Sequence, residues 1–303
     1  MMGVSPTLPL PSLRAQPQPT TNRIDPALLA RAKAGDARSQ LLVGYAYDRE
    51  SSDLDEAGAW YHKAAESGDA TAQFVLGWAY LFGYFRSEDH NQASAWFRKA
   101  AEHDYSIDLS KVPILFLDKN PYGTLGFLYD DGKALPQDYA QAAFWYRKGA
   151  EQGDAGSQLL LASLYFDGKG VPQDFEQAAI WNRKAAEQGN EEAQANLGTL
   201  YLAGHGVPQD FKEAKEWLQK ASGQGNAAAL YNLGTMYAKG QGVEQNNAAA
   251  YLCFDLAAAR LTGPDQAGAE KARDLTASFL TPEEISKVQE AAAKWFAAHP
   301  PRR

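Results

Sequence analysis

The chain has 303 residues, of which 45% are apolar and 22% charged, and its formal net charge is −8. This length exceeds what one compact core usually organises, so it predicts several domains or one elongated repeat array. The acidic balance argues against nucleic-acid binding, which depends on clustered positive charge. The only cysteine, Cys253, excludes an intramolecular disulfide framework and a cysteine-rich metal cluster.

Residues 1–22 contain prolines that break any helix and interrupt the apolar run of a secretory signal, and we interpret them as a disordered Pro-rich tail. The compartment stays open: cytoplasmic by default, or periplasmic if a signal has been removed. No other stretch approaches the roughly 18 consecutive apolar residues of a membrane span. Residues 24–35, IDPALLARAKAG, indicate one short helix that ends at a glycine.

From residue 35 onward one motif returns at nearly constant spacing. Its tyrosine and tryptophan columns repeat every 36 residues in the second half of the chain: Tyr129, Tyr165, Tyr201 and Tyr237, and Trp145, Trp181 and Trp217, with Cys253 next. The same columns continue upstream through Tyr47 with Trp60 and Tyr80 with Trp96. The sequence therefore contains six repeats, and residues 24–35 resemble the second half of another.

Two irregularities interrupt the register. The first repeat is three residues short in its middle loop, and 13 extra residues lie somewhere in the segment 104–121. That segment carries the apolar run Val112 to Leu117. It could cover a neighbouring surface or contribute to it.

Each repeat predicts a hairpin of two helices. Ala193, Leu197 and Tyr201 are spaced by four on one helical face, and Ala178, Trp181 and Ala185 share a face on a second type of helix. A Gly or Ala beside each Leu would let two helices approach closely. The predicted fold class is all-α, a right-handed superhelical solenoid of antiparallel helix hairpins with about six repeats of 36 residues.

The loops carry helix start and stop signals. An Asp is followed three residues later by Glu or Gln in five repeats, which is the capping-box pattern, at Asp53, Asp89, Asp138, Asp174 and Asp210. A Gly suited to a left-handed helix end recurs at Gly35, Gly68, Gly153, Gly189 and Gly225, and the Asp or Asn that follows can cap the next helix.

The pattern A-x-x-x-L-G-x-x-Y, G-x-G-V-x-x-D, A-x-x-W and A-A-x-x-G resembles the Sel-one-like repeats, bacterial relatives of the tetratricopeptide repeats, over residues 35 to 260. The resemblance implies curved stacks of antiparallel helix pairs and an adaptor role in protein complexes. We expect a solenoid over 23–262, and 263–303 as two C-terminal capping helices, the second opening with Thr281, Pro282 and Glu284. Cys253 and Leu261 depart from the Trp and Gly columns, so the array degenerates there.

Most residues that suggest chemistry fit the repeat better. The segments Gly168-Lys169-Gly170 and Gly204-His205-Gly206 lack the strand and the full fingerprint of a phosphate loop, so hairpin turns are favoured. The five histidines show no metal-ligand spacing, and Cys253 in the Trp column should be an inert packing residue. Lysines three residues after each Trp could attract an acidic partner, but a solvated lysine complementing the helix dipole explains them more simply. We expect no cofactor and no metal.

By analogy with tetratricopeptide arrays, the concave surface is lined by two columns of each first helix. The first three repeats place large aromatics there, and the candidate partner-binding residues are Tyr45, Phe74, Trp78, Phe127, Asp130 and Phe166. Rings at such positions are typical of peptide-binding hot spots. Asp48, Asp130 and Asp131 add negative charge, so the expected ligand is a hydrophobic peptide that carries Lys or Arg.

The function expected from the sequence is therefore a non-enzymatic adaptor or scaffold that binds a peptide or helix of a protein partner in its concave groove. Two alternatives remain. One is a cell-wall-related binding or hydrolytic protein, because cysteine-rich relatives have been linked to that role, although this chain lacks their cysteines and a recognisable nucleophile motif. The other is a structural protein that associates with itself through imperfect caps.

Overall fold

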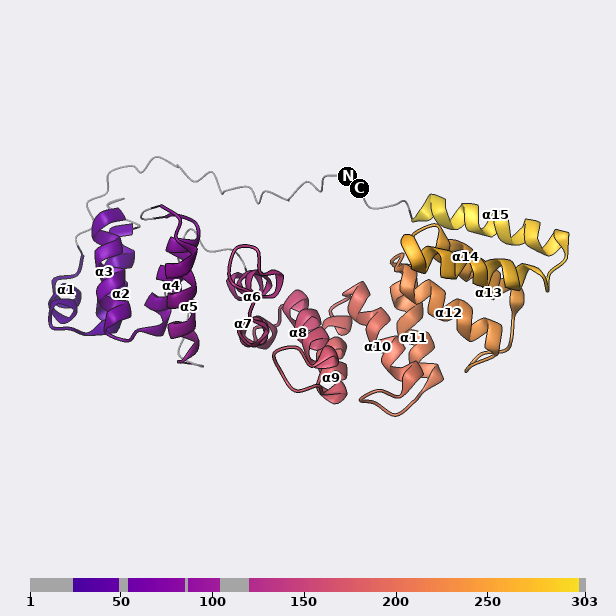
Figure 1. Cartoon of the computed structure of the whole chain (residues 1–303), viewed down its shortest axis with the longest axis horizontal. Helices are drawn as coiled ribbons and strands as arrows, with labels where there is room; N and C mark the ends of the chain where they lie inside the picture. Colours follow the sequence, from indigo (N-terminus) through magenta and orange to yellow (C-terminus); the bar gives the residue numbers. More distant parts are fainter. Residues whose placement is uncertain (1–23, 49–53, 85–86, 104–119, 300–303) are drawn as a thin grey trace. The chain divides into compact units, whose positions relative to one another are not determined.

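The computed structural model describes residues 24–48, 54–84, 87–103 and 120–299. Regular structure in these ranges is helical, without a strand (Figure 1). The first helices are α1 (Pro26–Lys33), α2 (Ala37–Ala46), α3 (Leu54–Glu66), α4 (Ala70–Leu81), α5 (His90–Ala101) and α6 (Pro121–Asp131). They are followed by α7 (Tyr139–Glu151), α8 (Ala155–Asp167), α9 (Phe175–Glu187), α10 (Glu191–Ala203) and α11 (Phe211–Gly223), then by α12 (Ala227–Lys239), α13 (Asn247–Ala258), α14 (Gly263–Ala277) and α15 (Pro282–Ala298).

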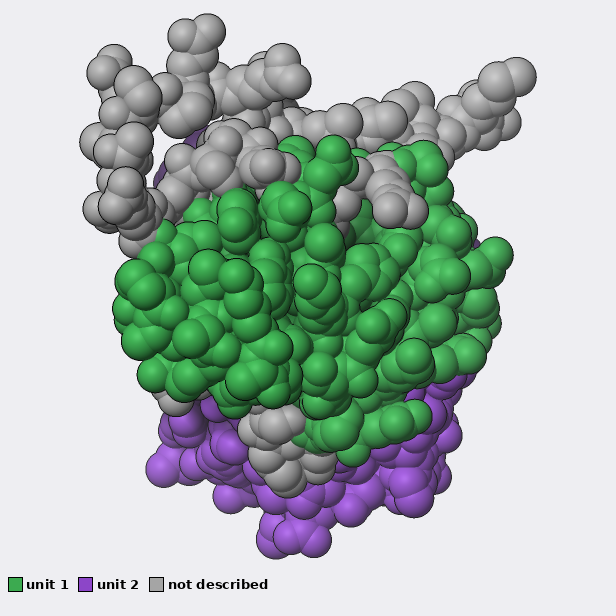
Figure 2. Space-filling model, turned by 90° about the vertical axis from the view of Figure 1, so that its left-hand side faces the viewer, with its two compact units in different colours: residues 1–124, 128–137 green, residues 125–127, 138–303 purple. Residues whose placement is uncertain are grey.

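Three features expected from the sequence lie outside the described residues. They are the Pro-rich tail at 1–22, almost all of the insertion at 104–121, and the cap at Asp53. The chain divides into two compact units, coloured separately in Figure 2. Unit 1 comprises residues 1–124 with 128–137, and unit 2 comprises residues 125–127 with 138–303, so that α6 is shared between them.

Within each unit, consecutive helices pack as hairpins: α2 with α3 and α4 with α5 in unit 1, and α8 with α9, α10 with α11 and α12 with α13 in unit 2 (Figure 1). Each repeat thus supplies a first helix and a second helix, as the two apolar faces in its sequence predict. The columns of Leu, Trp and Ala form the buried seam, as in the cluster of Leu197, Trp217, Ala185, Ala193 and Ala214. The predicted all-α array of helix hairpins is confirmed.

The turns follow the predicted signals. Every glycine expected to end a second helix has a positive φ, between +89° at Gly153 and +96° at Gly35. The Asp or Asn that follows accepts a hydrogen bond from a backbone N–H of the next helix, as Asn190 does from Ala193 at 2.9 Å. In the middle loop, Asp174 accepts from the Gln177 N–H at 3.0 Å. The reciprocal bond of a capping box is seen at Thr281 and Glu284.

The small residue beside each Leu lies where two helices meet. A Cβ added at Gly198 would stand 2.6 Å from Leu218 Cγ, and one at Gly234 would stand 2.7 Å from Phe254. A Cβ added at Gly170 or Gly206 would come closer still to the backbone at the start of the preceding second helix, at the Tyr139 and Phe175 oxygens. These glycines are therefore packing and turn residues, as the hairpin interpretation of the Gly-rich loops requires.

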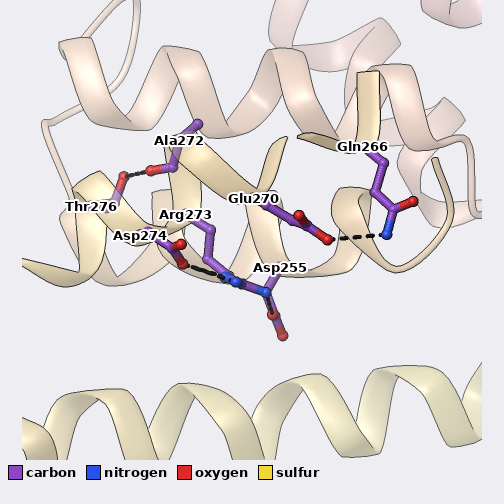
Figure 3. A network of polar contacts seen from close by, with 7 residues as sticks. All are labelled: Asp255, Gln266, Glu270, Ala272, Arg273, Asp274 and Thr276. Atoms are coloured by element: carbon purple, nitrogen blue, oxygen red, sulfur yellow. Dashed lines mark hydrogen bonds and ion pairs between the residues drawn. The ribbon is translucent and has the colours of Figure 1, made fainter. Parts of the chain in front are cut away.

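The helices at the two ends cover apolar surface. In unit 1, α1 buries Ala32 against Val43 and Trp60. In unit 2, Leu256 and Ala257 of α13 pack with Ala269 of α14 and Ala292 of α15. Polar contacts fasten this end: Arg273 lies between Asp255 and Asp274, at 3.4 Å and 2.9 Å (Figure 3). Arg260 also lies over the Trp295 ring, 4.7 Å from its centroid.

Candidate protein-interaction surfaces

The six residues expected to bind a partner differ widely in exposure. Phe74 and Trp78 are 0% and 2% exposed, whereas Phe127 and Phe166 are 52% and 40% exposed. Tyr45 is half-buried and packs against the core of the first two repeats, and Asp130 is half-buried as well. They also fall in both units: Phe127 and Phe166 belong to unit 2, and the other four belong to unit 1.

The expectation that Phe74 and Trp78 line an open surface is therefore wrong, and the cause is local packing. The Phe74 ring lies 5.7 Å from Phe97 and 5.4 Å from Tyr122, centroid to centroid. Phe82 stacks on Trp78 at 4.9 Å with an interplanar angle of 19°. The position of a residue in the repeat determines where its side chain leaves the helix, but not how many large side chains surround it. Phe74 and Trp78 are therefore core residues.

Phe127 and Phe166 remain available on the first helices of unit 2. Phe166 also belongs to a small aromatic cluster, because its ring meets Phe175 edge-on at 5.2 Å. Phe175 in turn stacks with His205 of the next repeat at 5.1 Å and 20°. Both rings are accessible to a partner, and burial of one ring can contribute on the order of 2 kcal/mol. They are not the most exposed ring of the described residues, since Phe279 is 65% exposed.

The acidic residues expected beside the aromatics are largely neutralised or buried. Asp48 is buried and accepts hydrogen bonds from the Tyr84 hydroxyl at 2.8 Å and the Tyr61 hydroxyl at 3.4 Å. Burial raises the pKa of the Asp48 carboxyl, although these two hydrogen bonds oppose the shift. Asp131 pairs with the exposed Lys133 at 2.8 Å, so its charge is partly compensated.

The lysine column has a role that the sequence analysis missed. In four of the five repeats that carry this tryptophan, the ammonium group of the lysine lies over the ring of the tryptophan three residues earlier, at 4.3 Å for Lys63, 4.2 Å for Lys99, 4.0 Å for Lys184 and 3.8 Å for Lys220. Lys148 instead lies over the Phe144 ring, 5.6 Å from its centroid. These cation–π contacts cover the outer edge of the Trp column. The lysines also lie in the last helical turn, where they complement the dipole as expected. The sequence signal for these cation–π contacts was the i, i+3 spacing of Trp and Lys.

A second recurring contact joins neighbouring repeats. In three repeats the residue two positions after the Trp reaches the Tyr of the following first helix. Arg147 donates to the Tyr165 hydroxyl at 2.9 Å, and Arg183 donates to the Tyr201 hydroxyl. In repeat one this position is His62, whose Nε2 lies 3.1 Å from the Tyr80 hydroxyl. The interruption of the arginine column by His62 was visible in the sequence.

Two cavities lie at this same place in the repeat. One, of about 90 Å³, lies between α3 and α4 and is lined by Leu54, Asp55, Gly58, Ala59, His62, Ala79 and Tyr80. The other, of about 470 Å³, lies between α9 and the following repeat and includes Ile180, Arg183, Lys184 and Val207. The larger one is a shallow surface, and Ile180 is its exposed apolar residue.

The described ranges hold neither a candidate metal-binding group nor a candidate membrane-spanning helix. No group of three His, Cys, Asp or Glu side chains there could hold a metal ion. Burial raises the pKa of the Cys253 thiol to about 12, which disfavours the nucleophilic thiolate. Among the helices described, none has the length and apolar character needed to cross a lipid bilayer.

Comparison with known proteins agrees with this architecture. The sequence pattern of the Sel1 repeat matches six segments, residues 37–69, 70–105, 125–154, 155–190, 191–226 and 227–260. A Sel1 repeat protein from Oxalobacter formigenes is 33% identical, with 74% of this chain and 88% of that chain covered and a TM-score of 0.44. The protective antigen c5321 of uropathogenic Escherichia coli, which displays an SLR fold, is 22% identical over 89% of this chain and 94% of that chain, with a TM-score of 0.32. No curated protein matches the chain.

The matched segments together cover more than half of the chain. Stacked helix hairpins form extended surfaces of the kind that repeat proteins use for binding. The chain belongs to the Sel1 repeat family. Proteins of this family generally serve as scaffolds for protein interactions.

Proposed function

We propose that this protein is a non-enzymatic adaptor that binds a peptide segment or helix of another protein on the first-helix surface of unit 2. The observation that carries the proposal is the exposure of Phe127 and Phe166, at 52% and 40%. Both occupy columns in which later repeats carry small or aliphatic residues: Ser163 and Thr199 correspond to Phe127, and Leu202 and Ala238 correspond to Phe166. The fold therefore does not require phenylalanine at either position.

This surface would favour an apolar side chain of the partner. Phe166 and Phe175 form an edge-to-face pair, and Asp167, next to Phe166, is paired with Lys169 at 2.8 Å. An aromatic surface whose nearby charge is locally compensated binds mainly by burying apolar area. Basic residues in the partner would then contribute less than the apolar anchor, because the paired acids are screened and exposed.

The repeat itself supplies the variant that tests this proposal. The double substitution Phe127→Ser and Phe166→Ala introduces residues already present in the same columns, at Ser163 and Ala238. Ile180→Glu is the matched control, because Ile180 is 39% exposed on a second helix and Glu216 occupies its column. Partners would be cross-linked in extracts of the source organism and quantified by mass spectrometry for wild type and both variants.

We expect one set of partners to fall by about tenfold or more with the double variant and to persist with Ile180→Glu, since a buried aromatic anchor contributes about 1–2 kcal/mol or more. Binding of a purified member of that set would then be titrated against all three proteins. Equal recovery by wild type and the double variant would refute the assignment of this surface. Turnover of peptidoglycan or a β-lactam would instead favour the cell-wall alternative, and a concentration-dependent mass in light scattering would favour self-association.

A further inference from the structure

The cavity between α3 and α4 in unit 1 differs from its counterparts in the other repeats. His62 lies on its wall, and the corresponding residues in repeats two to five are Arg98, Arg147, Arg183 and Gln219. Gly58 is the smallest residue of its column, and Ala59 stands where repeats three and four carry Phe144 and Ile180. The side chains at these positions are therefore shorter in repeat one than in repeats three and four, and the cavity here has a volume of about 90 Å³.

The walls of the cavity suit a flat positive group. Tyr80 presents its hydroxyl, His62 presents its ring, and Asp55 provides a carboxylate. The Tyr80 hydroxyl oxygen can still accept a hydrogen bond while it is bonded to His62. The volume exceeds that of a single water, which needs roughly 10–15 Å³, so a group of several heavy atoms can enter.

Two other repeats show which contact an arginine makes at the position of His62. Arg147 and Arg183 each direct a guanidinium group to the hydroxyl of the tyrosine that corresponds to Tyr80. In repeat one the corresponding tyrosine, Tyr80, contacts the imidazole of His62 instead. Residue 62 therefore places no guanidinium group beside this tyrosine. The arginine–tyrosine contacts of repeats three and four thus indicate how an arginine of a ligand could bind to Tyr80.

The charges around the cavity also favour a cation. The positive end of the α3 dipole would repel a cation, but Asp55 and Glu56 in the first turn of α3 compensate for the dipole. The larger cavity of unit 2 has Arg183 and Lys184 on its wall together with Glu176 and Glu187, so its charges balance.

We propose that this cavity is a binding site for an arginine side chain of a partner protein, with Asp55 and the Tyr80 hydroxyl as acceptors for its guanidinium. The site lies on a second helix of unit 1 and does not depend on the proposed aromatic surface of unit 2. It would therefore select partners by one basic residue, independently of any apolar anchor.

The test uses the full chain and a small probe, Nα-acetyl-arginine amide, with the citrulline analogue as a neutral control of nearly the same shape. Binding is followed by NMR chemical shifts of the Gly58, Ala59 and Ala79 amides. The variant His62→Arg restores the residue of the other repeats and fills the cavity. The variant Asp55→Asn keeps the cavity and removes its exposed charge.

We expect saturable shifts with the arginine probe, and binding at least about tenfold weaker for the citrulline analogue, because hydrogen bonds to a charged group are stronger. His62→Arg should abolish the shifts, and Asp55→Asn should weaken binding by roughly threefold, as befits an exposed carboxylate. The proposal is wrong if citrulline binds as well as arginine, if His62→Arg binds like wild type, or if the arginine probe gives no saturable shift. Asp55→Asn keeps the test decisive should His62→Arg fail to fold.

Discussion

Single residues at the helix contacts decide how closely neighbouring helices pack. We predict that Gly198→Ala destabilises unit 2 by about 1–3 kcal/mol, because the new methyl group would stand 2.6 Å from Leu218 Cγ. Gly268→Ala is the matched control: Gly268 lies inside α14, and nothing is within 4 Å of its added Cβ. That change should stabilise by about 0.5–1 kcal/mol through helix propensity. Urea unfolding followed by circular dichroism measures both, and a loss equal for both variants would contradict the packing argument.

Asp48 makes the stability of unit 1 depend on pH. Because burial raises its pKa in the folded state, the native protein binds a proton more readily than the unfolded chain. Its ionisation therefore costs stability as the pH rises from the ordinary Asp pKa of about 3.9 through the raised folded value. We predict that Asp48→Asn gains stability relative to wild type as the pH increases across this window, in urea titrations at several pH values.

Asp36 provides a control of opposite sign. The hydrogen bonds from Ser39 lower the pKa of the Asp36 carboxyl, so its contribution is present above the unfolded pKa and is lost as the pH falls through the folded value. Asp36→Asn should therefore lose stability relative to wild type as the pH rises. Identical pH profiles for the two variants would show that the environment of Asp48 is not the cause.

At the scale of the element, each helix is delimited by side chains that bond its free backbone groups. Asp174 caps α9, and we predict that Asp174→Ala costs about 1 kcal/mol because the Gln177 N–H loses its acceptor. Asp174→Asn should be nearly neutral, since Asn246 caps α13 at the same place in its repeat. Thermal unfolding of the two variants side by side measures the difference, and an equal effect of Ala and Asn would rule out the cap.

The ends and caps of most described helices could be predicted from the sequence. The left-handed glycines and the capping aspartates are local, so a short segment such as Gly189-Asn190 determines both the end of one helix and the start of the next. The burial of Phe74 and Trp78 could not be predicted, because it depends on rings from other helices and turns, including Tyr122 and Phe82. The residues that form the Lys–Trp and Arg–Tyr contacts recur at fixed positions of the repeat. The contacts themselves could be recognised only from the distances between the side chains.

At the scale of the whole molecule, an array of repeats leaves an apolar face at each end that another element must cover. In unit 2 this element includes α15, where Ala292 is buried and Ala291 is exposed. We predict that Ala292→Glu displaces α15, because an unpaired buried charge is costly, and that it raises amide hydrogen exchange in α13. Ala291→Glu places the same charge in water and should leave exchange unchanged. Unchanged exchange in α13 of Ala292→Glu would show that α15 is not needed as a cover.

The contact between Arg183 and Tyr201 recurs between Arg147 and Tyr165. Because the same contact joins successive repeats, a whole repeat could be lost or gained without removing it. If residues 191–226 were lost, Asn190 would stand where Asn226 caps α12, and Arg183 would face Tyr237. The junction would keep its cap and its arginine–tyrosine partner, and would lose the bond from Gln194 to the Ala186 carbonyl. Recombination between misaligned gene copies could thus remove or add a block of 36 codons at this boundary and still yield a folded product.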